Sequence, residues 1–191
     1  MTRRIPILAL CIVTACGAGD GDAADSAAPA PVSNTSQPFQ QQLAEVNAYV
    51  LTMDNVNKFF SAQQNLLNKM AALSPTEREA ELARSDAATV PDATLDDLTS
   101  RVEKDPVYLA AVREAGITPR EYVLVTMSMM QSQLAAGVVK SRPLDDADSL
   151  TREMKANAAN VRFVREHEVE LTRRRTELAT LVKRLAGTDG T

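Results

Sequence analysis

The stretch from Thr118 to Lys140, TPREYVLVTMSMMQSQLAAGVVK, constrains the fold more than any other part of the chain. It begins with a helix start signal. Thr118 can cap free backbone N–H groups, Pro119 suits the first helical position, and Glu121 stands where a capping-box carboxylate reaches back. The following residues are apolar on nearly every face of a helix, and such a helix needs neighbours on all sides. The stretch therefore predicts a buried central helix with other helices packed around it.

Ten large apolar side chains of this stretch are expected to be buried. They are Tyr122, Val123, Leu124, Val125, Met127, Met129, Met130, Leu134, Val138 and Val139. A membrane-spanning helix needs about 20 predominantly apolar residues. Only eighteen residues lie between Glu121 and Lys140, and five of them are polar. We therefore expect a core helix and not a spanning one.

The composition favours a single all-α domain. The chain has 191 residues, of which 45% are apolar but only 4% are aromatic, and it has no tryptophan. A core of this kind must be built from Leu, Val, Ala and Met, which are residues typical of helices. We expect an irregular bundle of five or six helices over residues 38–187, followed by a short tail, 188–191. The net charge of −4 makes nucleic acid an improbable partner.

Helix boundaries can be placed along the body. Cap signals occur at Ser74 with Glu77, at Thr94 and at Asp105 before a proline, and Gly116 suits a left-handed C-cap. Thr52 followed by Asp54 indicates either a new helix start or a local break. A last helix is expected from about Ala159 to Ala186. Its apolar row recurs every seven residues at Val164, Leu171, Leu178 and Leu185. This row could pair with a partner protein, but packing inside the body is favoured because the central helix needs cover.

The N-terminus has the pattern of an export signal. Arg3 and Arg4 precede a short apolar run, Ile5–Val13, and the sequence then reads Val13-Thr14-Ala15-Cys16. This pattern resembles the lipobox of bacterial lipoprotein precursors. The resemblance implies cleavage after residue 15 and lipid attachment at Cys16, whereas Cys11 follows Leu10, which is too large for the cleavage position.

The resemblance also implies a location. A lipidated Cys16 would anchor the exported protein to a membrane, since each buried methylene contributes about 0.8 kcal/mol. Gly17 follows the cysteine, and this position resembles that of lipoproteins sorted to the outer membrane. We therefore expect the body to face the periplasm. Residues 16–37 are small and polar, so we expect a flexible tether with a reach of roughly 25 Å.

No chemical site is evident in the body. His167 is the only histidine, and a metal site or acid–base pair with Glu170 would lack further ligands. We therefore expect no enzyme activity, cofactor or metal, and interpret His167 as a structural residue. The methionines, above all Met127, Met129 and Met130, could line a pocket for an apolar ligand, but core filling is favoured.

Two further stretches, GITPREYVL and NAANVRFVREHEVEL, resemble small exported helical proteins of bacteria whose function is not established. The sequence thus leaves two functions open. The favoured one is a non-enzymatic envelope lipoprotein that contacts another envelope protein through a helix face. The alternative is a carrier or sensor of a small apolar ligand, and an enzyme ranks third.

The lipid anchor can be tested directly. Metabolic labelling with a fatty acid should mark the wild-type protein and not Cys16→Ser, because the thiol is the acceptor of the diacylglyceryl group. Labelling is read from the purified protein by in-gel fluorescence, with Cys11→Ser as the matched control. Equal labelling of the wild type and Cys16→Ser would contradict the prediction that Cys16 carries the lipid.

Overall fold

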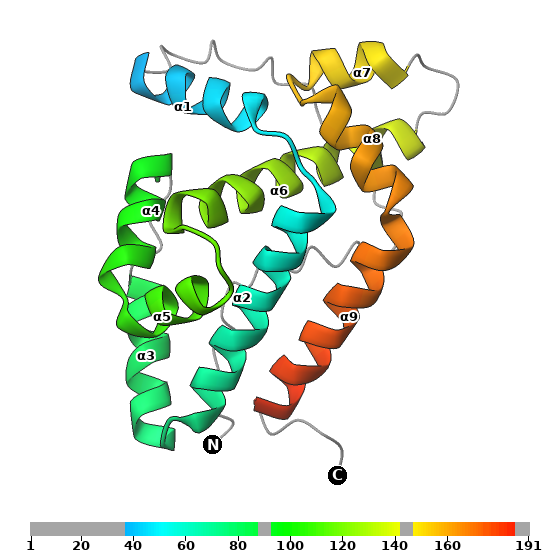
Figure 1. The fold of residues 1–191 in the computed structure, drawn as a ribbon. Coiled ribbons are helices and arrows are strands. Elements are labelled where there is room, and N and C mark those ends of the chain that lie inside the picture. Colours follow the sequence, from blue (N-terminus) through cyan, green and yellow to red (C-terminus); the bar gives the residue numbers. More distant parts are fainter. Residues whose placement is uncertain (1–36, 88–92, 142–146, 186–191) are drawn as a thin grey trace, which may run out of the picture.

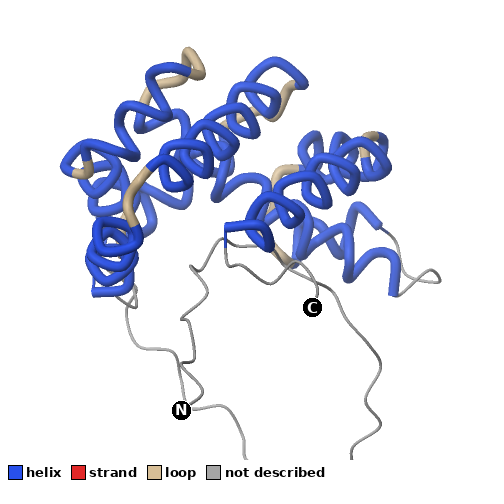
Figure 2. Tube along the Cα trace, turned by 90° about the horizontal axis from the view of Figure 1, so that it is seen from below, coloured by secondary structure: helices blue, strands red, loops and turns tan. Residues whose placement is uncertain are grey.

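The structure of the protein is a computed structural model that describes residues 37–87, 93–141 and 147–185. These ranges contain nine α-helices and no strand, so the predicted all-α class is confirmed. The helices are α1 (Gln37–Ala48), α2 (Met53–Ala72), α3 (Pro75–Ala87), α4 (Leu95–Lys104), α5 (Pro106–Glu114), α6 (Pro119–Ser141), α7 (Ala147–Glu153), α8 (Ala158–Glu166) and α9 (Glu168–Leu185). The leader, Cys16 and the tether up to Ser36 lie outside the described residues. Figure 2 shows the helices and the loops that join them.

The central position predicted for α6 is confirmed. This helix contacts α1, α2, α4, α5, α7 and α8. It lies across the upper end of α2, with α4 and α5 at one end and α7 and α8 at the other (Figure 1). In its first half Tyr122, Val123, Leu124 and Val125 are all buried. Four consecutive residues point to every side of one helical turn, so this half is enclosed all round.

The second half of α6 is covered on one side only, and here the predicted all-round burial is wrong. Leu134 is 52% exposed, while Met127, Met130 and Val138 are half-buried. The inward positions are mostly small residues, namely Ser128, Ser132 and Ala135, together with Met129 and Val139. Small side chains allow neighbouring helices to approach closely, and the hydroxyl of Ser128 donates to the backbone carbonyl of Val46 at 3.1 Å. Leu134, Met130 and Val138 are left on the side of α6 that faces away from these contacts.

The number of helices exceeds the five or six expected. The predicted last helix is two helices, because α8 ends at Glu166, His167 is its C-cap, and α9 begins at Glu168. The break has a tertiary cause: α8 packs on α6 whereas α9 packs on α2, and one straight helix cannot follow both. The apolar row survives the break, since Val164, Leu171 and Leu178 are buried. Its predicted packing inside the body is confirmed.

The predicted helix starts are also confirmed. Thr52 and Thr94 form capping boxes with Asn55 and Asp97. Ser74 and Glu77 exchange the same pair of bonds at the start of α3. Thr118 accepts from the N–H of Glu121 at 3.2 Å, whereas the Glu121 carboxylate, predicted to reach back to the cap, accepts from the hydroxyl of Tyr49. Asp105 caps α5. Gly116 has a φ of +71°, a conformation that favours glycine and makes the turn from α5 into α6.

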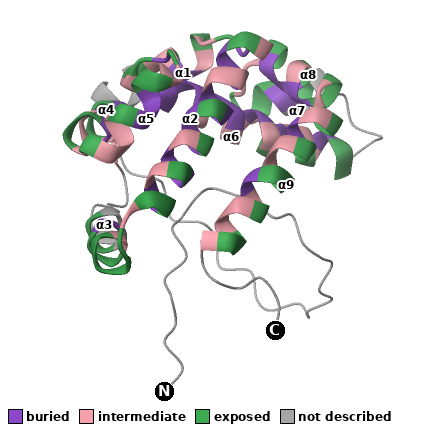
Figure 3. Cartoon of the chain, turned by 60° about the horizontal axis from the view of Figure 1, so that its bottom comes forward, coloured by how far each residue is buried: buried purple, intermediate pink, exposed green. Residues whose placement is uncertain are grey.

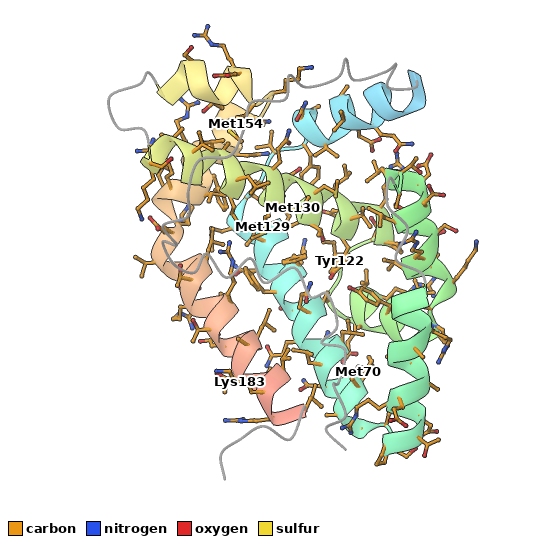
Figure 4. The ribbon with its side chains drawn as sticks, turned by 180° about the vertical axis from the view of Figure 1, so that it is seen from behind. Met70, Tyr122, Met129, Met130, Met154 and Lys183 are labelled. Atoms are coloured by element: carbon orange, nitrogen blue, oxygen red, sulfur yellow. The ribbon has the colours of Figure 1, made fainter. Side chains whose placement is uncertain are left out.

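Tyr122 connects α6 to α2 and α5 near the centre of the body (Figure 4). Its ring stacks on that of Phe59, with centroids 5.2 Å apart. Its hydroxyl accepts from Nε2 of Gln63 at 2.6 Å and lies 3.0 Å from the hydroxyl of Tyr108. Figure 3 shows the buried residues along α2 and α6, whereas α3 carries mostly exposed ones. The stable centre is therefore the region where α2, α5 and α6 meet.

Side chains of α8 bind the short segment that joins α1 to α2. The amide of Asn160 is 1% exposed. Its oxygen accepts from the N–H of Leu51 at 2.8 Å, and its nitrogen donates to the carbonyl of Tyr49 at 2.8 Å. Asn157 donates to the carbonyl of Asn47 at 2.7 Å. Two asparagines from a distant part of the chain thus form hydrogen bonds with backbone N–H and C=O groups that have no partner within a helix.

We expect Asn160→Ala to lower the free energy of unfolding by about 2–4 kcal/mol, because the buried N–H of Leu51 would lose its acceptor and the carbonyl of Tyr49 one donor. Urea denaturation followed by circular dichroism measures the change. Asn68→Ala, at an exposed position of α2, is the matched control and should change stability by less than about 0.5 kcal/mol. Equal stability of the two variants would contradict the role of Asn160.

Candidate functional site

A groove lies between the second half of α6 and the two helices on either side of the break at His167, α8 and α9. Its volume is about 1310 Å³. The side of α6 with small residues packs against the body, which leaves the opposite side uncovered. In addition, the chain changes direction at His167, so that α9 packs along α2 and moves away from α6. The site is therefore a consequence of the two features in which the fold departs from the sequence-based expectation.

The floor of the groove is apolar. Met130, Leu134 and Val138 line it from α6 and are spaced four residues apart, so they form one line along the helix. Val164 and Leu171 line it from α8 and α9. Leu134 is one of three large apolar residues that are clearly exposed in the described parts of the chain. A line of apolar side chains that remain partly or fully exposed inside a hollow is typical of a binding surface.

The rim of the groove is basic. Four lining side chains are basic and two are acidic, although the whole chain carries a net charge of −4. Lys140 and Glu168 form an ion pair at 3.0 Å. The other basic residues, Arg162, Arg165 and Arg175, form no ion pair with any described residue. The local charge thus has the opposite sign to that of the chain.

Arg175 differs from the two arginines that precede it. Arg173 and Arg174 both donate to Glu170, and these bonds lower the pKa of Glu170 to about 2. Arg175 is half-buried in the groove wall, and burial lowers the pKa of its guanidinium. A guanidinium that is partly removed from water without a counter-ion is costly, and an anion in the groove would offset that cost.

The methionines do not gather around the groove. Figure 4 shows Met70 and Met154 at opposite ends of the body, with Met129 and Met130 on α6 between them. Met70 and Met129 are buried in the core, and Met127 packs against it. Among the described residues, Met130 is the only methionine that lines the groove. The favoured interpretation as core filling is confirmed for Met70, Met127 and Met129.

His167 stands beside the groove without joining a cluster of ligands. Its ring packs against that of Phe163, with centroids 4.5 Å apart. Glu170, its proposed partner, is occupied by Arg173 and Arg174. No group of three side chains able to hold a metal ion occurs in the described residues. The surroundings favour the structural interpretation of this histidine, which ends α8.

Two acidic groups, Glu81 and Asp105, lie close together on the side of the body away from the groove. Glu81 on α3 is only 5% exposed and is paired with Arg84. Burial raises the pKa of Glu81, and the nearby carboxylate of Asp105 raises it further. Asp105 itself accepts the N–H groups of Val107 and Tyr108, both at 2.9 Å. Because Asp105 is held as a helix cap, this pair joins α3 to the start of α5 and resembles no acid–base dyad.

Of the described helices, α6 alone has the length and apolar composition to cross a membrane, with a mean hydropathy of 1.3 over its most apolar window. Half of that window is buried inside the body. The core helix of a soluble protein can have the same length and composition. Contacts with six other helices account for the apolar character of α6.

Comparison of the chain with protein-family models, with curated proteins and with solved structures gave no match. The function is therefore inferred from the groove and from the residues of the leader.

The groove itself was not predicted from the sequence. No pattern in the sequence distinguishes Arg162 and Arg165 from the other charged residues of the last predicted helix, and Leu134 is predicted to lie in the core. One signal was available for Arg175, because no carboxylate stands three or four residues away on either side to pair with it. Arg173 and Arg174, by contrast, have Glu170 and Glu177 at that spacing.

The raised pKa of Glu81 predicts an unusual pH dependence. The folded state binds this proton more tightly than the unfolded chain, so the contribution of Glu81 to stability decreases as pH rises above the ordinary value of 4.5. We expect Glu81→Gln to raise the melting temperature at neutral pH, and to raise it less at about pH 5. Differential scanning calorimetry of both proteins measures the difference. Glu103→Gln, at an exposed position of α4, should leave the profile unchanged, and identical profiles for all three proteins would contradict the assignment.

Proposed function

We propose that this protein is a membrane-anchored lipoprotein of the cell envelope, whose helical body is a non-enzymatic interaction module that binds another envelope protein through the groove. The observation that carries the proposal is the apolar line of Met130, Leu134 and Val138 along α6, in which Leu134 is exposed and the other two are half-buried. Leaving Leu134 half in water forfeits part of the roughly 1.5–3 kcal/mol that its burial could contribute. A partner that covers it would recover this free energy.

The size of the groove favours a protein partner over a small ligand. Pockets for small molecules are usually about 300–1,000 Å³ and enclose most of the ligand. This groove has about 1310 Å³ and is bounded by helices on two sides. The carrier of a small apolar ligand therefore remains the second candidate. Its supporting observation is the apolar floor, but it would leave the charged rim without a role.

The anchor rests on the leader residues. The lipobox-like sequence that ends at Cys16 supports export and attachment to a membrane, most simply the outer membrane, facing the periplasm. A tether with a reach of roughly 25 Å would keep the body close to the bilayer. Partners fixed in the same envelope would then meet the groove at high effective concentration, so that even a weak contact would be occupied.

Photo-crosslinking in the native host tests the contact surface. A benzophenone amino acid that replaces Leu134 should crosslink to one discrete protein, because this position would lie inside the interface. The products are separated by electrophoresis and identified by mass spectrometry. The same amino acid in place of Ala80, an exposed residue of α3, is the matched control and should give no such product.

Two results would overturn the proposal. The same products from both positions would show that the groove has no special role. Crosslinks from position 134 to lipid alone, with no protein, would support the carrier instead.

A further inference from the structure

We infer that the groove receives an acidic amphipathic helix of the partner protein, with its apolar side on α6 and its carboxylates on the arginines of α8 and α9. This inference rests on the proposed function and specifies the chemistry of the partner. The apolar floor and the three guanidinium groups that pair with no described residue lie in the same hollow. A ligand that matches one and not the other would leave either buried charge or exposed apolar surface behind.

The floor has the dimensions of a helix-binding groove. Met130, Leu134 and Val138 cover two turns of α6, or about 12 Å. An amphipathic helix presents apolar side chains at i, i+3, i+4 and i+7, which cover a similar length on one side. Gly137 lies beside this line, and a Cβ added there would meet no atom within 4 Å. The space above the floor is therefore open to the side chains of an incoming helix.

The charges determine the sign of the partner. Arg162 and Arg165 are three residues apart and so lie on one side of α8, while Arg175 lines the groove from α9. The guanidinium N–H groups of all three arginines donate no hydrogen bond to any described residue. Carboxylates suit them, since a guanidinium binds a carboxylate through two parallel hydrogen bonds. Glutamates on the flank of a bound helix would meet them.

An anionic membrane surface matches the groove less well. Recognition of anionic lipids generally uses a cluster of about four to eight lysines and arginines. Here three free arginines stand beside Glu166, and the fourth cation, Lys140, is already paired with Glu168. A narrow ligand can avoid these carboxylates, but a flat surface that covers the whole rim would meet them. A single helix is therefore the better fit.

The test selects peptides on the mature, full-length protein. The probe is a displayed library of helices of about four turns, in which leucines hold one side and each flanking position samples Glu, Gln or Lys. Binders should be enriched in Glu at one flank. The binding of a selected peptide, measured by fluorescence anisotropy, should weaken as salt rises, because ionic strength screens the contacts.

Variants separate charge from shape. Arg175→Gln should weaken the selected peptide by roughly tenfold or more, the effect of one lost charge-assisted contact. The double variant Arg162→Glu, Arg165→Glu should reverse the selection toward Lys. Gly137→Leu should fill the floor and weaken peptides of every charge. Arg113→Glu, at an exposed position on α5 away from the groove, is the matched control and should change nothing, and circular dichroism checks the fold of each variant.

The possible failures are distinguishable. Peptides that depend on Gly137 and Leu134 but show no preference for Glu would overturn the acidic partner and retain the interaction module. Absence of any groove-dependent peptide would overturn both. Sedimentation of the wild type, but not of the Arg162→Glu, Arg165→Glu variant, with phosphatidylglycerol vesicles, without peptide binding, would identify a lipid surface. A dimer in light scattering that Leu134→Glu dissociates would identify a second copy of this chain.

Discussion

The backbone that joins α1 to α2 must be hydrogen-bonded where it meets the rest of the body, and the whole arrangement depends on how this is achieved. Asn160 provides both an acceptor and a donor to it. The amide can do so only if α8 lies directly against this segment. Ser128 of α6 meanwhile donates to the last part of α1. These bonds place α8 against α6, and α9 must then turn at His167 to reach α2. The groove is the space that this turn leaves beside α6.

The stretches GITPREYVL and NAANVRFVREHEVEL both supply side chains that bind the end of α1 or the segment that follows it. In GITPREYVL, Arg120 binds Glu45 of α1 through Nε and Nη2, at 2.8 and 2.6 Å, and Glu121 accepts from the hydroxyl of Tyr49 at 3.3 Å. Burial and this carboxylate raise the pKa of Tyr49 to about 12. In NAANVRFVREHEVEL, the asparagines bind the backbone. These side chains stabilise the fold, while Arg162 and Arg165 of the second stretch line the groove.

Local signals predicted most of the fold. In a capping box the two side chains are three residues apart, as in Ser74 with Glu77. The pattern can therefore be recognised from the local sequence alone. The central position of α6 and the apolar row through Leu171 and Leu178 could be predicted because burial leaves a periodic trace. The open side of α6 left no such trace. Leu134 is as apolar as its buried neighbours. It is exposed because the tertiary structure packs the side of α6 that carries Ser128 and Ser132 against the neighbouring helices.

The three consecutive arginines of α9 show how one helix can serve stability and recognition together. Successive residues point about 100° apart, so the three side chains leave the helix in different directions. Two of them point to where Glu170 and Glu177 can pair with them on the same helix. Those pairs are exposed and contribute little to stability, but they neutralise charge that would otherwise compete for an anionic ligand. The third, Arg175, has no carboxylate within reach on its own helix and turns into the groove. The neutral surroundings thus concentrate the unpaired positive charge where the apolar floor lies, and a ligand gains from both contacts only at that place.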